Sequence, residues 1–121
     1  MHNKILFVFL SAEASVKQPL NDRVRGVVAE KLRAGSLWKK LARDLRVTDP
    51  VIDAIEEDEN GDGQECCSQA LRKWRESNGA CATNRKVMIC LTNMGYGNVN
   101  WHIMRELDLV LRENMPQAER S

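Results

Sequence analysis

The chain's most suggestive chemical pattern is the acidic stretch DENGDGQE, residues 58–65. The first half of a calcium-loop signature, D-x-[DN]-x-[DN]-G, is met by Asp58, Asn60, Asp62 and Gly63. The twelfth loop position must supply a bidentate glutamate, but Gln69 stands there, and a neutral amide cannot replace that carboxylate. We interpret the stretch as a solvated turn in which Asn-Gly and Asp-Gly dipeptides supply positive φ angles. A calcium-binding module is the weaker alternative.

The four cysteines, Cys66, Cys67, Cys81 and Cys90, form no metal or disulfide pattern. No C-x-x-C spacing occurs, the two histidines lie far away in the sequence, and adjacent cysteines rarely bridge each other. The pattern predicts free thiols in a reducing compartment. Redox control through the adjacent pair is an alternative, although a buried thiol pair is commoner.

Catalysis is not indicated by the sequence. Cys81 and Cys90 are potential nucleophiles, but His102 is the only histidine within the predicted helices that could activate them. The chain has neither a glycine-rich phosphate loop nor a carboxylate-histidine metal pattern. We therefore predict no enzymatic activity, no catalytic residue, no metal ligand and no cofactor.

The composition indicates one helical domain. The chain has 121 residues, of which 5% are aromatic and 29% charged. Few aromatic residues and few strand-like runs favour helices, whose cores are readily filled by Leu, Val, Ile and Ala. The formal net charge of +1 gives no overall attraction to nucleic acid or membrane, so a charged partner must be inferred from local patches.

Apolar residues at helical spacing predict six helices joined by short connections. The predicted segments are residues 19–35, 36–47, 48–59, 64–77, 82–95 and 98–114. Ser36, Asp49 and Thr83 are predicted amino-caps, and Gly35, Gly79 and Gly95 are predicted stops. Six helices with short connections predict an all-α antiparallel bundle.

Charged residues separate into basic and acidic groups. The basic group comprises Lys39, Lys40, Arg43, Arg46, Arg72, Lys73, Arg75, Arg85 and Lys86. The acidic group comprises Asp53, Glu56, Glu57, Asp58, Glu59, Asp62 and Glu65. Both groups could be ordinary solvated faces, or a positive face on one copy could bind a negative face on another. Nucleic-acid binding through the basic second helix is an alternative, which the acidic third helix argues against.

The three tryptophans divide into core and surface positions. Trp38 and Trp74 lie on apolar stripes and are predicted to be buried, whereas Trp101 points away from the stripe of the last helix. Trp101 is thus either exposed, an anchor for a partner, or covered by the apolar run of residues 5–10, and we favour the last reading.

The amino-terminal segment is apolar and precedes the predicted helices, so we expect it to lie outside the helical domain. We expect an apolar extension at residues 1–18, a helical domain at 19–115 and a polar tail at 116–121. Residues 4–14 mimic a short signal peptide, but the apolar run is shorter than a typical one and far too short to span a bilayer. We interpret it as an extension that docks on the domain or as the remnant of an upstream region; secretion is a minority alternative.

The segments WKKLARDLRVTDPVIDAIE, LRKW and ATNRKVMICL resemble a death domain over roughly residues 20–107. The residues that carry the resemblance are Trp38, Leu41, Ala42, Arg43, Leu45, Val47, Asp49, Ile52, Asp53, Ile55, Glu56, Leu71, Trp74, Ala82 and Thr83. Within the family, the stretch LARDLRVTDPVIDAIE is most similar to death domains of the Fas-associated adaptor (FADD) type. The chain departs from that pattern at the acidic turn, at Ser68 and at Gly95-Tyr96-Gly97.

The resemblance implies a six-helix Greek-key bundle that binds other death domains and catalyses nothing. Such modules recruit caspases or kinases into apoptotic or innate immune assemblies, and the second and third helices form much of their binding surface. The resemblance therefore implies partner-binding roles for Arg43, Val47 and Asp49. The charge pattern adds Lys39, Lys40, Arg46, Asp53, Glu56, Glu57 and Arg72 to the predicted surface. We expect a cytoplasmic module that binds a receptor tail or an adaptor, with possible self-association, no nucleic acid and no membrane insertion.

Overall fold

The computed structural model of the chain describes residues 15–113. The apolar run at residues 5–10 and the tail at 116–121 lie outside this range, so the expectations about them remain predictions.

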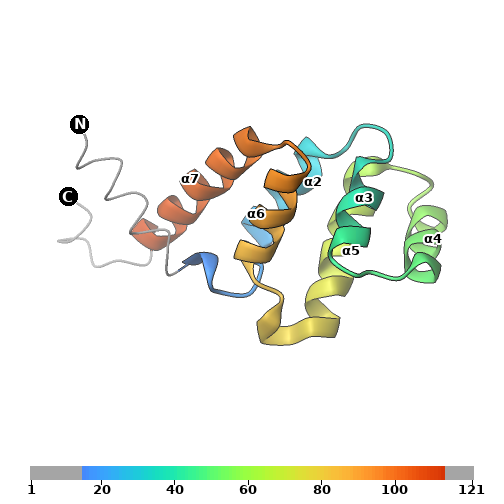
Figure 1. Ribbon diagram of the computed structural model, residues 1–121, viewed down its shortest axis with the longest axis horizontal. Helices are drawn as coiled ribbons and strands as arrows, with labels where there is room; N and C mark the ends of the chain where they lie inside the picture. The colour runs from blue at the N-terminus through green and yellow to red at the C-terminus, as the bar shows by residue number, and fades with distance from the viewer. Residues whose placement is uncertain (1–14, 114–121) are drawn as a thin grey trace.

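The described residues form six α-helices and one 3-10 helix, without a named strand (Figure 1). The helices are α2 (Asp22–Lys31), α3 (Leu37–Asp44), α4 (Asp49–Asp58), α5 (Gly63–Asn78), η1 (Gly79–Cys81), α6 (Asn84–Asn93) and α7 (Gly97–Glu113). The predicted all-α, six-helix architecture is confirmed. None of the helices in this range is long and apolar enough to cross a membrane.

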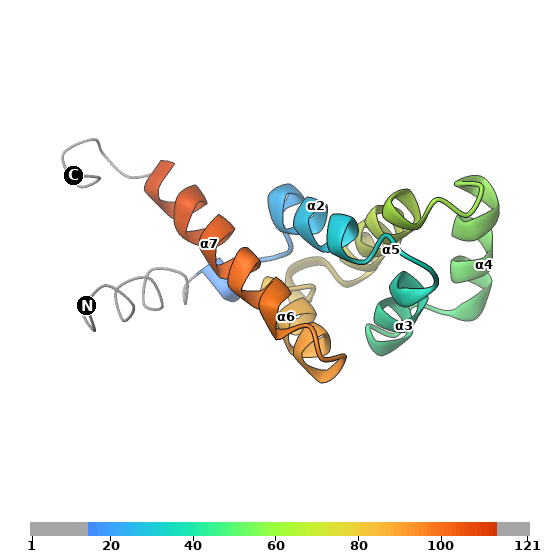
Figure 2. The same ribbon diagram turned by 90° about the horizontal axis from the view of Figure 1, so that it is seen from above.

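The helices α2 and α5 pack against each other at the centre of the bundle. α3 and α4 contact α5 at one end of the molecule, and α6 and α7 pack side by side at the other, where α7 also contacts α2 (Figures 1 and 2). One hydrophobic core runs through all six helices and includes Trp38 and Trp74, which are buried as predicted. The fold therefore separates an α3–α4 end from an α6–α7 end.

The first helix is shorter than its apolar pattern predicts. Asn21 is its amino-cap, and its Oδ1 accepts a hydrogen bond of 2.8 Å from the Val24 N–H, so the helix begins at Asp22 instead of Pro19. The preceding residues bond elsewhere: the Leu20 N–H donates to the Ala82 carbonyl at 2.8 Å. The chain leaves the helix at Leu32, three residues before the predicted stop at Gly35.

Two boundaries around α3 and α4 also differ from the predictions. α3 ends at Asp44, and Arg46 lies beyond it with a left-handed φ of 69°, so Arg46 is not on the helical face expected for it. Ser36 occupies the amino-cap position but makes no side-chain capping bond. The amino-cap of α4 is Thr48, because Asp49 already belongs to the first turn.

The acidic turn joins α4 to α5. Asn60 and Gly61 have positive φ angles of 53° and 74°, as predicted for the first dipeptide. Asp62 instead caps α5: its Oδ1 accepts hydrogen bonds of 3.1 Å from the Gln64 and Glu65 N–H groups. Residues 15–113 contain no group of three or more candidate ligands placed to hold a metal ion. The turn at Asn60-Gly61 and the cap at Asp62 together connect α4 to α5.

Gly63 is required for a reason that the sequence does not reveal. Its φ is not positive, in contrast to the prediction for the second dipeptide. A Cβ at this position would overlap the backbone carbonyl of Arg33, in the loop that follows α2. The glycine therefore permits the close approach of that loop to the first turn of α5.

A buried amide joins the start of the described chain to α6. Asn84 is 0% exposed, and its Nδ2 donates to the Ser15 carbonyl at 2.9 Å. Its Oδ1 accepts from the Asn21 N–H at 3.3 Å, and its own N–H donates to the Gln18 carbonyl at 3.0 Å. These three bonds hold residues 15–21 against the first turn of α6, and they are called the Asn84 clasp below.

Candidate functional site

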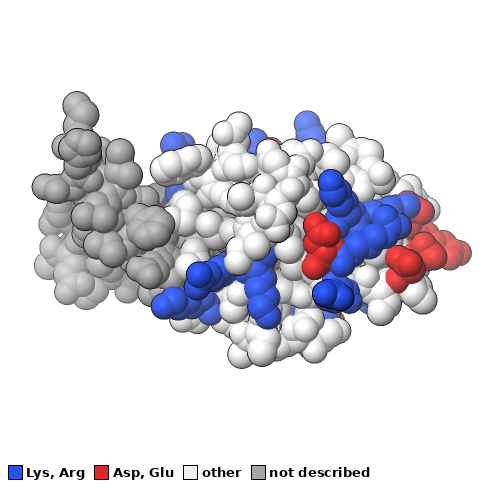
Figure 3. Space-filling view, viewed as in Figure 1, with Lys and Arg blue, Asp and Glu red and all other residues white. Residues whose placement is uncertain are grey.

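The predicted interaction residues gather mainly on α3, on α4 and on the connection between them. Trp38, Leu41 and Ala42 turn into the core, which leaves the charged residues of α3 on the outside. Figure 3 shows basic side chains over α3 beside acidic side chains over α4. The cations of α3 and the carboxylates of α4 are therefore neighbours on one end of the molecule, whereas the members of the basic group from residue 72 onward lie on α5 and α6. We call the exposed charged residues of α3, α4 and their connection the α3–α4 surface.

Lys39 and Glu56 tie α3 to α4. The Lys39 Nζ lies 2.5 Å from a Glu56 carboxylate oxygen, and the Lys39 side chain is only 23% exposed. The same ammonium lies 5.9 Å from the centroid of the Trp38 ring, which is within cation–π range. These two residues thus orient the helices and have little charge left for a partner.

Arg43 and Asp49 form a more open contact. The Arg43 Nε donates to the Asp49 Oδ1 at 3.4 Å, and both side chains are mostly exposed. Exposed ion pairs of this kind contribute little to stability and exchange readily for other contacts. The pair bridges the end of α3 and the start of α4, and both partners remain accessible to another protein.

Four predicted charges have no ion pair within the described residues. They are Lys40, Arg46, Asp53 and Glu57, and all four are exposed. Val47 lies half-buried on the connection between the two helices. Asp44 of α3 and Asp58 of α4 are also exposed without an ion pair among the described residues, so the α3–α4 surface offers two unpaired cations and four unpaired anions.

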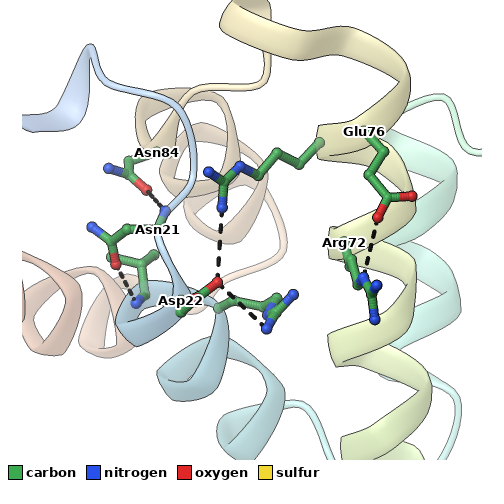
Figure 4. A network of polar contacts seen from close by, with 8 residues as sticks. Asn21, Asp22, Arg72, Glu76 and Asn84 are labelled. Carbon is green, nitrogen blue, oxygen red and sulfur yellow. Dashed lines mark hydrogen bonds and ion pairs between the residues drawn. The ribbon is translucent and has the colours of Figure 1, made fainter.

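Arg72 does not belong to this surface. It lies on α5, where its Nε donates to the Glu76 carboxylate at 3.1 Å, and it faces α2 (Figure 4). Close by, Asp22 lies between two arginines, at 3.4 Å from Arg25 and 3.8 Å from Arg75. These residues line an open hollow of about 670 Å³ between α2 and α5. The prediction placed Arg72 with the α3–α4 residues because sequence order does not show which helix α5 turns toward.

Two residues that line this hollow, Asp22 and Arg25, were not identified from the sequence. Asp22 reads as an ordinary first-turn acid of a helix, and Arg25 as its i,i+3 partner. Only the packing of α5 against α2 brings them beside Arg75. No pattern in the sequence gives that contact.

Burial holds three of the four thiols in their neutral form. All four cysteines are free, as predicted, and Cys66 and Cys67 are buried. Burial raises the pKa of Cys67 from its ordinary value of 9.0 to about 12, and burial also raises the pKa values of Cys66 and Cys90. A raised pKa keeps these groups as neutral thiols, which are poor nucleophiles. The adjacent pair is thus part of the core and does not form an accessible redox site.

Comparison with known proteins identifies the family. The sequence model of the death domain matches residues 26–105, from within α2 to within α7. The chain belongs to the death domain family. The six-helix bundle is accordingly a death-domain fold, and modules of this family act in protein–protein interaction with other death-fold domains. Neither the curated proteins nor the solved structures gave a significant match.

Proposed function

We propose that this death domain is a non-catalytic adaptor module that assembles other death domains in apoptotic or innate immune signalling. Its partners are a receptor's cytoplasmic tail or another adaptor, and the assembly acts upstream of caspase or NF-kappaB activation in the cytoplasm. The likeness of residues 41–56 to adaptors of the FADD type supports this assignment.

The observation that carries the proposal is the incomplete internal pairing of the α3–α4 surface. Lys39 and Glu56 are satisfied within the fold, whereas Lys40 and Asp53 are exposed without an ion pair among the described residues. Complementary charges on two proteins raise the rate of encounter and fix the orientation of the complex. A surface with free charges of both signs suits binding to another domain of mixed charge, including a second copy of this chain.

The same surface is poorly suited to nucleic acid. A phosphate backbone attracts clusters of cations and repels carboxylates. Here Glu56 and Asp49 lie within ion-pair distance of Lys39 and Arg43, and Asp53 and Glu57 are exposed on the neighbouring helix. The structure gives no observation that favours the nucleic-acid alternative.

The proposal is tested with charge reversals at the two residues whose side chains make no internal pair. We expect the full chain to bind a panel of immobilised death domains, or itself in light scattering, in a manner that weakens as salt rises. Lys40→Glu and Asp53→Arg should each weaken a complex that uses the α3–α4 surface. For self-association the double variant should recover binding, since the reversed charges complement each other again.

Two outcomes would count against the proposal. A chain that stays monomeric at every salt concentration and captures no death domain would contradict the adaptor function. Binding that neither reversal weakens would show that the α3–α4 surface is not the binding site, although the adaptor function itself would stand. Lys17→Glu provides the matched control, because it reverses one exposed charge near the opposite end of the molecule.

A further inference from the structure

An apolar groove lies between α6 and α7, at the end of the molecule opposite the α3–α4 surface. Its volume is about 380 Å³, and its walls include Met88 and Ile89 of α6, Met104 of α7, and Val16 from the first described turn. The death domain match begins at residue 26, so the Val16 wall lies outside the part of the chain that the family accounts for.

The surface around the groove exposes large apolar side chains. Ile89, which lines the groove, is 51% exposed, and Trp101, next to Asn100 on α7, is 66% exposed. Trp101 and Met104 are three residues apart on α7, and such residues are neighbours on a helix surface. Exposed apolar side chains beside a groove mark a surface that binds another segment or another protein.

The chain carries an apolar segment close to this groove. Residues 5–10 are Ile, Leu, Phe, Val, Phe and Leu, a run without a polar residue. Leu10 precedes Val16 by six residues, and a connection of that length spans at most about 20 Å. Because Val16 itself lines the groove, the run is tethered beside it at a high effective concentration. A second protein would have to compete with a segment that is always present.

One buried acceptor on the groove wall, in Asn100, points to the same occupant. The Asn100 Oδ1 and the Asp108 Oδ1 are buried and have no hydrogen-bond partner among the described residues. Asn100 lines the groove, whereas Asp108 is not among its lining residues, and the other carboxylate oxygen of Asp108 pairs with the Arg112 Nε at 3.0 Å. Buried acceptors without a donor are unfavourable. A segment docked in the groove would bring a backbone N–H donor to the Asn100 Oδ1.

We propose that residues 5–10 of this chain dock intramolecularly in the α6–α7 groove. Phe7 and Phe9 supply the apolar side chains that fill the space between Met88 and Met104, and the segment covers the flank that carries Trp101. The docked segment closes the apolar end of the domain and leaves the α3–α4 surface open. This inference does not depend on the proposed adaptor function.

Methionine oxidation in the full chain measures the docking directly. Met88 and Met104 line the groove, whereas Met94 is half-buried outside it and serves as an internal standard. Hydrogen peroxide oxidises accessible methionines to sulfoxides, which peptide mass spectrometry resolves site by site. Phe7→Asp/Phe9→Asp should raise the oxidation rates of Met88 and Met104 several-fold and leave Met94 unchanged. His2→Asp/Asn3→Asp adds the same charge outside the apolar run and should change none of the three.

Other outcomes of this experiment overturn the proposal. Rates at Met88 and Met104 that do not respond to Phe7→Asp/Phe9→Asp would show that the run does not occupy the groove. Protection that strengthens with protein concentration would assign the groove to a second copy of the chain. If Met94 accelerates equally, the variant has unfolded and Ile89→Asp, at an exposed groove position, decides the question. Selective acceleration at Met88 and Met104 then supports docking, and unchanged rates contradict it.

Discussion

The two ends of this death domain differ in the chemistry of the surface that they expose to water. At the α3–α4 end, charged residues pair partly with each other, and the remaining charges are solvated by water. At the α6–α7 end, apolar side chains surround a groove, and water solvates them poorly. A charged surface can therefore remain hydrated until another protein binds it. An apolar groove is hydrated poorly, which favours a segment of the same chain that covers it permanently.

The two ends also differ in their relation to the family. The α3–α4 surface lies wholly inside the matched residues 26–105. The groove depends on Val16 and on the Asn84 clasp, whose partners Ser15, Gln18 and Asn21 precede the match. The match thus covers the whole of the first surface and most of the groove's walls, whereas Val16 and the clasp partners lie before it.

The largest expected effect comes from removing the Asn84 clasp. Asn84→Ala leaves the Asn21 N–H and the Ser15 carbonyl without their buried partner, which should lower the free energy of unfolding by about 1–3 kcal/mol. The damage should be confined to the α6–α7 end, so partner binding at the α3–α4 surface should persist in the folded fraction. Denaturant unfolding checks the stability, and Asn98→Ala, at an exposed asparagine, is the control. Equal losses for the two variants would show that the clasp has no special role.

The second prediction separates structural from available charges on α3. Lys40→Glu should weaken partner binding about tenfold, which corresponds to about 1.4 kcal/mol, with little change in stability. Lys39→Glu should instead lower the melting temperature, because it places two carboxylates where the Lys39–Glu56 pair joins α3 to α4. Calorimetric titration and thermal melting measure the two effects. Identical behaviour of the two variants would contradict the division of this surface into paired and unpaired charges.

A third prediction concerns the helix that both ends share. Burial raises the pKa of Cys67 on α5 to about 12, so the folded state keeps a proton that the unfolded state releases above 9.0. Stability is therefore complete below pH 9 and falls as the pH rises toward 12, by on the order of 1 kcal/mol at pH 10. Because α5 contacts both α2 and α3, the loss should affect the two ends together.

Unfolding measured between pH 7 and pH 10 tests this alkaline sensitivity. Cys67→Ala should be less stable than the unsubstituted chain at pH 7, because it leaves a cavity, and should lose less additional stability at pH 10. Cys81→Ala, at the exposed thiol, should retain the full pH dependence. A Cys67→Ala slope equal to that of Cys81→Ala would assign the sensitivity to other groups.

The smallest effect is expected at Arg46. Its left-handed φ of 69° suits glycine, so Arg46→Gly should change the free energy of unfolding by no more than about 1 kcal/mol. The substitution removes an exposed cation from the α3–α4 surface and should weaken binding. Arg46→Gly and Arg46→Asn both tolerate this backbone conformation, so a binding loss shared by the two variants identifies the guanidinium as the cause. If both variants retain binding, Arg46 does not contribute to the binding surface.

Much of the fold was predictable because its signals are local. Apolar spacing placed Trp38, Trp74 and Val87 in the core, and Thr83 caps α6 as predicted, with its Oγ1 accepting from the Lys86 N–H. Predictions failed where distant segments compete for the same backbone groups. The start of α2 moved because Leu20 bonds to Ala82, and Arg72 turned toward α2 because of helix packing that no local pattern encodes.

The candidate surface was predictable in composition but not in pairing. The sequence identifies Lys39, Arg43, Asp49 and Glu56 as charged and mostly outward-facing residues. Which of them neutralise each other depends on the angle between α3 and α4, which places Lys39 by Glu56 and Arg43 by Asp49. Sequence patterns report which face a residue occupies, and tertiary packing decides which charges remain free.

The contact between Gly63 and Arg33 bears on how freely the acidic turn can vary. A saturation library over residues 58–65 should accept many residue types at Gln64 and at Glu65, whose side chains are exposed to solvent. Gly63 should remain nearly invariant among folded members, since any side chain would push the loop after α2 away from α5. The least tolerant position of the turn would then be a glycine whose φ is not positive. Its intolerance would reflect the steric contact with Arg33, which neither charge nor backbone dihedral preference reveals.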